Sequence, residues 1–199
     1  MSLLIKLYLY SFFFYEYNIQ CPKLIECTMH EIFKKRRSIR EYSSKEVTEE
    51  QIHNILCSAM VAPSGNHVNP WEFVVVREKE TLSKLSKCGK WQSFIKDCSV
   101  AIVIIAKESD TDMWLQDCSI AAAHIYLESA NQGLGCCWAN VKDSQTEGGE
   151  DREEYVRNIL NIPKEYRVVC IMSIGYPIRE IQQHSEDEYD EKKVHREGF

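Results

Sequence analysis

The alternation of apolar and polar positions predicts a succession of helices and strands from residue 29 onward. "MHEIFKKR" (29–36) has the spacing of a short helix. Thr48 and Gln51 stand in the relation of a capping box, and the apolar residues after them recur at helical spacing, which predicts a helix ending at "APSGN" (62–66). These apolar residues are Ile52, Ile55, Leu56, Ala59 and Met60.

Two continuous β-branched runs predict strands. "WEFVVVR" (71–77) and "SVAIVIIAK" (99–107) have the composition of central strands that are buried on both faces. The amphipathic segment between them, "EKETLSKLSK" (78–87), predicts a helix. Further strands are expected at 136–141 and 167–177, with a charged helix over 151–160 between them and a linker-like stretch at 142–150.

The longest predicted helix covers residues 114–133 and closes on Gly133 as its C-cap. Its apolar residues lie nearly all round, and such a helix needs more cover than one small domain supplies. We therefore expect a core helix or a subunit interface, with His124 as a packed or interface residue. The acidic tail after Glu180 is expected to be mobile or wrapped on a partner.

The first 28 residues stand apart from this pattern. Residues 3–17, "LLIKLYLYSFFFYEY", are apolar and aromatic, but Lys6 and Glu16 bracket a run too short to span a bilayer. Neither a basic region before this run nor a small-x-small cleavage site between Asn18 and Glu26 supports a signal peptide. We expect 1–28 to be an extension that packs on the domain or a partner, or to precede a natural start at Met29. The predicted domain is 29–199.

Composition narrows the class of protein. A chain of 199 residues with 44% hydrophobic content can bury one sizeable core. Its net charge of -6 argues against a nonspecific nucleic-acid binder, which needs a broad positive surface. The nine cysteines include no C-x-x-C pair, so neither a disulfide framework nor a zinc site is indicated, and a reduced cytoplasmic setting is expected.

Positive charge nevertheless concentrates in "EIFKKRRSIREYSS" (31–44), where five cationic side chains fall within seven positions. Such a run often only keeps a surface helix soluble, and Lys34 and Lys35 are expected on the outward side of the first helix. The interleaving of arginine and serine favours a phosphate site, because a phosphate needs several convergent donors and local positive charge.

Three loops offer further contacts for a small ligand. "APSGNHVNPW" (62–71) joins a helix to a strand and can hydrogen-bond a polar ring edge through Ser64, Asn66, His67 and Asn69. "GLGCCWAN" (133–140) has glycines that let backbone approach a flat ligand. "IGYPIRE" (174–180) ends the last strand with a turn and Arg179. Each loop alone is a weak signal, and their order along the chain carries the information.

That order resembles the FMN-dependent nitroreductases over residues 29–199. The most specific elements are "RRSIREY", "APSGNHVNPWEFVVV", "GLGCCW", "NIPKEYRVVCIMSIGYP" and "VHREGF". The resemblance implies an α+β fold with a mixed central β-sheet flanked by helices. It also implies a homodimer that binds its flavins between the subunits.

The resemblance implies cofactor contacts motif by motif. The first motif would hold the FMN phosphate and the pyrimidine side of the flavin, and the loop at 62–71 would reach the flavin of the other subunit. The strand after "GLG" would face flavin N5 and O4 with its backbone, and the cation after "GYP" would bind phosphate. The residues of the first motif are Arg36, Arg37, Ser38 and Arg40, and those of the loop at 62–71 are Pro63, Ser64, Gly65 and His67. The strand after "GLG" contributes Ala139 and Asn140, and the cation after "GYP" is Arg179.

The implied activity is a ping-pong transfer of hydride from NADH or NADPH through flavin N5 to nitro, quinone or similar small acceptors. Arg40 would stabilise the anionic reduced flavin, with Asn140 as a second tuning residue. No side chain is an obvious proton donor, and the vicinal Cys136 and Cys137 are expected to pack as hydrophobes. His67 and Asn69 depart from the Asn and Gln usual in the family, which puts the ring and ribityl contacts in question.

Two other functions stay open at this stage. One is a specialised flavoenzyme on the same scaffold, such as a reductive dehalogenase or a dehydrogenase. Such enzymes usually carry a lid insertion, and the short spacing between Lys107 and Trp114 leaves little room for one. The other is a flavin-binding protein without enzymatic turnover. Neither a nucleic acid nor a membrane is expected as a partner.

Overall fold

The helices and strands follow the predicted order. The computed structural model describes residues 29–199, so the predicted extension at 1–28 lies outside the described residues. The elements are α2 (Glu31–Lys35), α3 (Glu49–Met60), β1 (Trp71–Val76), α4 (Lys79–Leu85), β2 (Val100–Lys107), α5 (Trp114–Asn131), β3 (Gly135–Asn140), α6 (Arg152–Leu160) and β4 (Tyr166–Gly175). Short 3-10 turns cover Gly65–His67, Ser93–Asp97, Glu186–Glu188 and Glu191–Lys193. In the described part of the chain, no helix is long and apolar enough to cross a membrane.

The capping box that begins α3 is confirmed. The Gln51 backbone N–H donates to the Thr48 hydroxyl oxygen at 3.2 Å, and the Thr48 backbone N–H donates to Gln51 Oε1 at 3.1 Å. Two backbone donors at the helix N-terminus, which no carbonyl inside the helix can reach, are satisfied in this way. The local sequence therefore fixes where α3 starts.

The four strands form one sheet in the order β1-β2-β4-β3, and each neighbouring pair is antiparallel. One isolated bridge, between Ser38 and Cys136, is parallel. It lies on the edge of β3 that does not face β4. The helices and the sheet confirm the predicted α+β class. The basic motif is thus tied to the sheet through one of its own serines.

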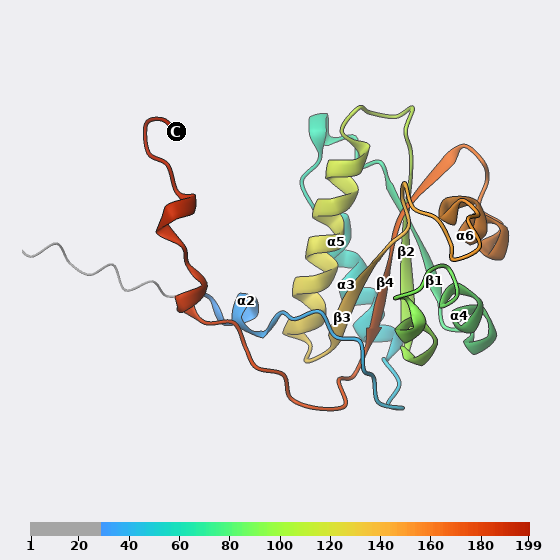
Figure 1. Cartoon of the computed structure of the whole chain (residues 1–199), viewed down its shortest axis with the longest axis horizontal. Coiled ribbons are helices and arrows are strands. Elements are labelled where there is room, and N and C mark those ends of the chain that lie inside the picture. The colour runs from blue at the N-terminus through green and yellow to red at the C-terminus, as the bar shows by residue number, and fades with distance from the viewer. Residues whose placement is uncertain (1–28) are drawn as a thin grey trace, which may run out of the picture.

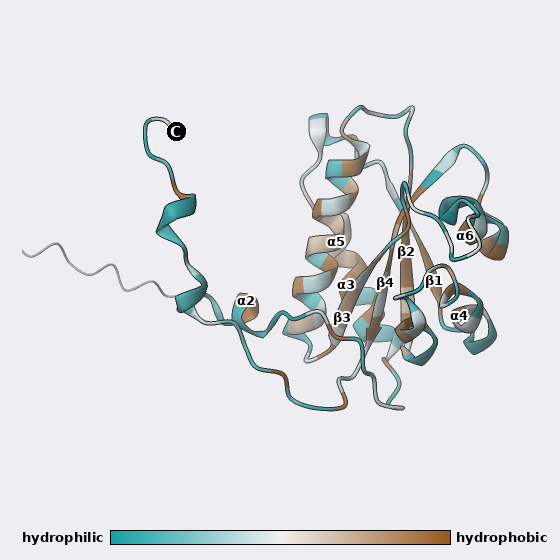
Figure 2. Ribbon diagram, viewed as in Figure 1, coloured by the Kyte–Doolittle hydropathy of each residue, from teal (hydrophilic) through white to brown (hydrophobic). Residues whose placement is uncertain are grey.

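Helices cover both faces of the sheet, with α3 and α5 on one side and α4 and α6 on the other (Figure 1). Side chains alternate along the central strand β2, so that Ile102 and Ile104 pack toward α3 and α5 whereas Ala101 and Val103 pack toward α4 and α6. Because both sides need apolar residues, the strand is hydrophobic at nearly every position (Figure 2). The predicted burial of residues 99–107 on both faces is confirmed.

The same prediction for the first strand is wrong. β1 lies at the edge of the sheet, where Glu72 is exposed and Val75 keeps 40% of its surface accessible. An uninterrupted β-branched run therefore does not by itself distinguish a central strand from an edge strand. The order of the strands in the sheet decides, because within residues 29–199 β1 pairs only with β2.

α5 buries one face and leaves another exposed. Ala121, Ala122 and Ile125 are almost wholly buried in the core cluster between α5, α3 and the sheet. Ile120 faces outward with 37% of its surface accessible, and Met60 and Val61 at the end of α3 are 56% and 75% exposed. Within one chain, α5 thus buries only part of its apolar surface.

The first part of the C-terminal segment, which was expected to be mobile or wrapped on a partner, contacts its own chain, whereas residues 185–199 are exposed. It leaves the body after β4 and runs beside α2 (Figure 1). The His184 backbone N–H donates to the carbonyl oxygen of Lys34 at 2.9 Å, and Glu186 Oε1 lies 3.8 Å from the ammonium of Lys34. The first part of the tail therefore packs against the chain's own basic motif.

Candidate functional site

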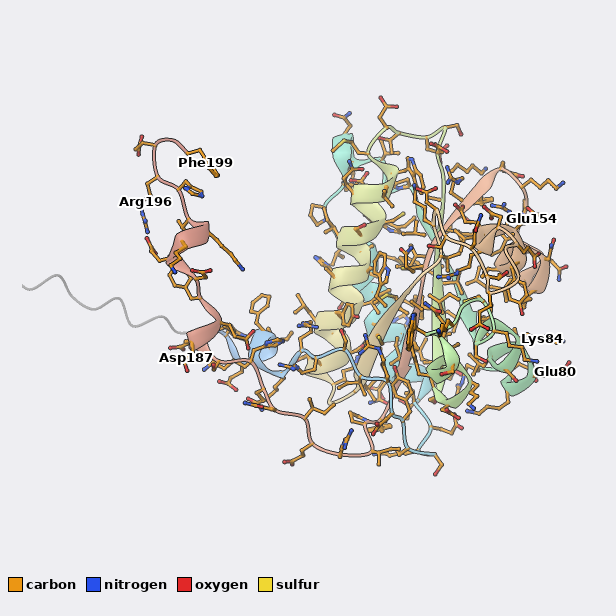
Figure 3. The ribbon with its side chains drawn as sticks, viewed as in Figure 1. Glu80, Lys84, Glu154, Asp187, Arg196 and Phe199 are labelled. Atoms are coloured by element: carbon orange, nitrogen blue, oxygen red, sulfur yellow. The ribbon has the colours of Figure 1, made fainter. Side chains whose placement is uncertain are left out.

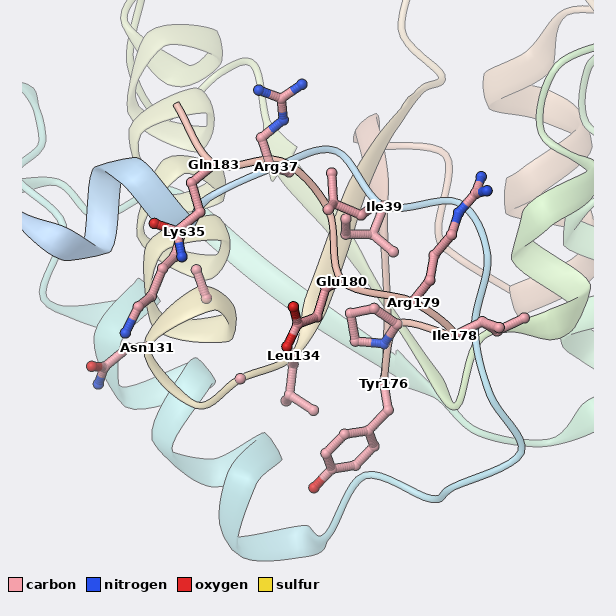
Figure 4. A pocket seen from close by; sticks show the side chains of 14 residues that line it. Lys35, Arg37, Ile39, Asn131, Leu134, Tyr176, Ile178, Arg179, Glu180 and Gln183 are labelled. Atoms are coloured by element: carbon pink, nitrogen blue, oxygen red, sulfur yellow. The ribbon is translucent and has the colours of Figure 1, made fainter. Parts of the chain in front are cut away.

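The basic motif and the turn after β4 lie side by side although they are far apart in the sequence. Tyr42 pairs with Pro177, and the Ser43 backbone N–H donates to the Tyr176 carbonyl oxygen at 2.8 Å. The Ile178 backbone N–H donates to the Glu41 carbonyl oxygen at 3.3 Å. Antiparallel backbone contacts thus bring "RRSIREY" and "IGYPIRE" together, and their side chains surround one cavity (Figure 4).

The place where residues 36–42 and 174–180 run side by side is called the crossing below. The Tyr42 hydroxyl fastens it to the sheet. Its oxygen lies 2.6 Å from the Ile39 carbonyl oxygen and 2.8 Å from Ser173 Oγ on β4. Burial raises the pKa of Tyr42 well above its ordinary value, so the hydroxyl stays a neutral donor. A Cβ on Gly175 would come within 2.9 Å of the Tyr42 ring, so a glycine is required there. Ile39 stands inside the basic motif, whose backbone is therefore held in place.

Two adjoining cavities open at the crossing. The larger, of about 650 Å³, has Lys35, Arg37 and Arg179 in its wall beside the apolar Ile39 and Leu134 (Figure 4). A smaller one of about 260 Å³ shares Arg179 and adds Ser38 and Arg40. Lys35 is exposed, as expected for the outward side of α2, and it also belongs to the cavity wall. The structure brings four of the predicted phosphate-site residues to one place.

Arg36 is held from two sides instead of lining either cavity. Its guanidinium lies 2.8 Å from His184 Nε2 and 5.5 Å from the centroid of the Tyr126 ring. Tyr126 also accepts the Trp138 backbone N–H at 2.7 Å, and its hydroxyl lies 3.3 Å from Ser38 Oγ. Tyr126 therefore joins α5, the basic motif and β3.

Tyr126 and His184 were both missed by the sequence reasoning. The first stands within the apolar pattern of α5, where an aromatic residue reads as core. The second stands in an acidic tail that carries no periodicity. Only the fold places them beside the arginines.

Asn140 and Ala139 have different orientations on β3. Backbone groups alternate along a strand, and Cys136 accepts from Ile39 while Trp138 donates to Tyr126, so even-numbered positions face the free edge. Asn140 shares that edge, and its carbonyl oxygen accepts from Arg152 at 2.8 Å. Ala139 pairs with Ile171 of β4 and is buried in the core on the α4 and α6 side.

The loop that holds Pro63, Ser64, Gly65 and His67 lies elsewhere. The Gly65 backbone N–H donates to Asp117 Oδ1 at 3.0 Å, near the start of α5. Asp117 and Tyr126 are nine residues apart on this helix, which corresponds to roughly 14 Å along its axis. One chain therefore does not bring this loop to the basic motif.

Left-handed backbone shapes the same loop. Asn66 has φ 52°, His67 has φ 58° and Asn69 has φ 51°, a region that asparagine tolerates better than most residues. The Asn69 backbone N–H donates to Ser64 Oγ at 3.0 Å. The loop is thus held in a defined conformation, with the His67 side chain exposed.

The remaining candidate residues are structural. Burial raises the pKa of the Cys136 and Cys137 thiols, which disfavours the reactive thiolate and fits packed cysteines. His124 Nδ1 lies 2.7 Å from the Ser58 carbonyl oxygen, a contact that joins α5 to α3. His124 was expected to be a packed or an interface residue, and this contact fits a half-buried residue packed between α5 and α3.

Comparison with known proteins gives a consistent group of relatives. The sequence profile described as "Nitroreductase family" matches residues 33–89 and 83–176. A protein of Archaeoglobus fulgidus named "Putative NADH dehydrogenase/NAD(P)H nitroreductase" is 36% identical over 169 residues, covering 82% of this chain and 94% of the relative. A relative of the same name from Methanothermobacter thermautotrophicus is 35% identical, covering 89% and 91%.

Solved structures and more distant relatives extend this comparison. An FMN-dependent nitroreductase from Clostridium difficile superposes with a TM-score of 0.83 at 41% identity, covering 86% of this chain and all of that one. Mouse iodotyrosine deiodinase 1 is 26% identical over 184 residues, covering 75% of this chain and 62% of the relative.

Replacing Tyr42 tests whether its hydroxyl holds the crossing together. In Tyr42→Phe, buried partners at Ile39 and Ser173 lose a contact, so the free energy of unfolding should fall by about 1–3 kcal/mol. Urea unfolding measures the change. The exposed Tyr189 provides the matched control, and Tyr189→Phe should alter stability by less than about 0.5 kcal/mol. Equal effects of the two substitutions would contradict this role of Tyr42.

Proposed function

The chain belongs to the nitroreductase family, and from this premise we propose that it is an FMN-dependent oxidoreductase that uses NADH or NADPH to reduce nitro, quinone or similar electron-poor acceptors in a ping-pong cycle. FMN, when bound, would supply the N5 atom that accepts hydride and passes it on. The names of the relatives support the class, and the Clostridium difficile neighbour is FMN-dependent by its title. The observation that carries the proposal is the convergence of Arg37, Ser38, Arg40 and Arg179 around adjoining cavities.

The donors present fit FMN. Arg37 and Arg179 supply guanidinium groups that suit a phosphate dianion, and Ser38 adds a hydroxyl on the adjoining side. A cavity of about 650 Å³ lies within the usual size range of cofactor sites. We assign the FMN-binding domain to residues 29–199 on these grounds.

Other residues would tune the electrostatics of the site. Arg40 is exposed toward the smaller cavity, where its charge would stabilise negative charge at the pyrimidine side of the ring. The Asn140 backbone N–H at the free edge of β3 is a donor for the ring edge. Ala139 would contribute by packing β3 onto the core, since its side chain is buried.

A homodimer would complete the site. The loop with Pro63, Ser64, Gly65 and His67 is remote from the basic motif of its own chain, so a second copy would have to supply it. The outward apolar residues Ile120, Met60 and Val61 offer a surface for that copy, because exposed apolar side chains that gather on neighbouring helices mark contact sites.

A specialised flavoenzyme is the second candidate, because iodotyrosine deiodinases are among the relatives. Only residues 108–113 connect β2 to α5, which leaves little room for a lid at that position. The simpler reductase is therefore preferred. Turnover of a halogenated phenol with no turnover of nitro or quinone acceptors would reverse this preference.

The cofactor proposal is tested on purified protein. Denaturation should release about one FMN per chain, because each chain supplies one basic motif, and NADH or NADPH should bleach the flavin absorbance under anaerobic conditions. Absence of flavin, together with no uptake of added FMN, would refute the proposal. Bleaching followed by no turnover with any acceptor would indicate a flavin-binding protein without catalysis.

The dimer proposal is tested by light scattering at micromolar concentration, where the wild-type chain should have the mass of a dimer. Ile120→Lys would bury an unpaired charge at the interface, so the dimer dissociation constant should rise by more than about 100-fold. Val75→Lys on the edge strand β1 is the control and should leave the dimer intact. A monomeric wild-type chain that still holds flavin would contradict the proposal.

The phosphate assignment is tested with two ligands. Arg37→Ala removes a charge-assisted contact, so the dissociation constant for FMN should rise roughly 30-fold to 1000-fold, whereas riboflavin, which lacks the phosphate, should be affected far less. Flavin fluorescence titration measures both. Lys84 on α4, which pairs with Glu80 and is 54% exposed, is the control (Figure 3). Equal effects of Arg37→Ala and Lys84→Ala on FMN affinity would mean that the basic run is only a solvated surface.

A further inference from the structure

The C-terminal tail reaches the arginine pair of the basic motif through one histidine. His184 Nε2 lies 2.8 Å from the guanidinium of Arg36, and its Nδ1 lies 3.3 Å from that of Arg37. Both carboxylate oxygens of Glu188 lie 2.8 Å from the same Nδ1. The imidazole is thus enclosed by two cations and one anion, and 20% of its side-chain surface remains accessible.

The chemistry of these groups fixes the direction of the hydrogen bonds. A guanidinium only donates and a carboxylate only accepts, so Nδ1–H donates to Glu188 and Nε2 accepts from Arg36. One neutral tautomer of His184 therefore connects Glu188 to Arg36. Arg37 meets the protonated Nδ1, which cannot accept, and within residues 29–199 its guanidinium has no hydrogen-bond acceptor of its own. Arg37 is also the member of the pair that lines the larger cavity.

The tail holds this arrangement by its own local structure. Glu188 ends the short turn Glu186–Glu188, in which its backbone N–H donates to the Ser185 carbonyl oxygen at 3.2 Å and its side chain accepts the Ser185 backbone N–H at 3.3 Å. The hydrogen bond from His184 lowers the pKa of Glu188, which keeps the carboxylate charged. The backbone of His184 is tied to Lys34. The turn and the tie to α2 both limit how far the imidazole can move.

We propose that Glu188 and His184 are positioning residues for the phosphate end of the flavin site: Glu188 orients His184, and His184 holds Arg36 in place so that its positive charge stays beside Arg37, which lines the larger cavity. The Tyr126 ring supports Arg36 from the other side, at 5.5 Å. A guanidinium fixed before binding loses less side-chain entropy when it meets its anion. The inference rests on the proposed function, since it names the phosphate of FMN as the ligand.

The contacts from Glu188 through His184 to Arg36, called the relay below, should make the site select FMN over riboflavin. The relay ends at the arginine pair, so it should favour FMN over riboflavin and leave the affinity for the ring unchanged. A tail that merely stabilised the fold would change the binding of both flavins equally. A tail that occupied the phosphate site as a competing anion would weaken FMN binding in the wild-type chain, and its removal would tighten it.

Flavin fluorescence titration of the full-length chain with FMN and with riboflavin separates these cases. His184→Ala should raise the dissociation constant for FMN roughly fivefold to fiftyfold and that for riboflavin less than about twofold, because only the phosphate contact depends on Arg36. Glu188→Gln, which keeps the size of the side chain, should weaken FMN binding in the same direction by a smaller factor. Glu191→Gln is the matched control, because Glu191 lies in the next turn of the tail and pairs with Arg196.

A double-mutant cycle adds a second readout. If His184 acts through Arg36, then His184→Ala in the Arg36→Ala background should change the dissociation constant for FMN less than about twofold, because the group that it positions is already gone. Additive effects of the two substitutions would overturn the relay. So would tighter FMN binding by His184→Ala, or equal losses for FMN and riboflavin. A wild-type chain that binds neither flavin refutes the proposed function, whereas a wild-type chain that binds FMN as tightly as His184→Ala refutes the relay alone.

Discussion

The buried hydroxyl of Tyr42 is the contact on which the geometry of the site depends. It lies between the Ile39 carbonyl oxygen and Ser173 Oγ, so one polar group joins the basic motif to the central part of the sheet. A buried hydroxyl without partners would cost stability, and this requirement restricts where the motif can sit. The cavities beside Arg37 and Arg40 form because the backbone between these two residues cannot move away from β4.

The sheet carries this arrangement because helices cover both of its faces. β2 is apolar at nearly every position and pins the two layers together, while β3 leaves one edge free. That free edge accepts Ile39 and presents the backbone of Trp138 to Tyr126. A covered sheet whose β3 edge meets the basic motif therefore gives rigid backbone groups next to a cationic motif, which is the combination that a flat anionic cofactor needs.

The sequence was informative where a local pattern determines the structure. The capping box at Thr48 and the double burial of β2 follow from short-range chemistry, and the motif order indicated the basic crossing. Sequence-based prediction failed for β1, which was expected to be a central strand. Its composition matches that of β2, but within residues 29–199 it has only one neighbouring strand. Tyr126 and His184 were missed because their roles arise from contacts across 88 and 148 positions, which no periodicity reports.

The charge distribution has a physical reason within the fold. Arg36, Arg37, Arg40 and Arg179 gather in a chain with net charge -6, although like charges repel. The chain offsets part of this repulsion itself, since Glu41 lies 3.2 Å from Arg179 and the neutral His184 accepts from Arg36. Arg37 and Arg40 line the cavities, and Arg37 meets a protonated nitrogen of His184 that cannot accept its donors. Acidic residues placed directly on these two arginines would compete with a phosphate, whereas acidic residues elsewhere on the surface do not. Carboxylates do reach the cavities, since Arg179 lines both of them and pairs with Glu41, and Glu180 lines the larger one. Within residues 29–199, however, no carboxylate forms an ion pair with Arg37 or Arg40, so an acidic protein keeps a cationic site at these two arginines.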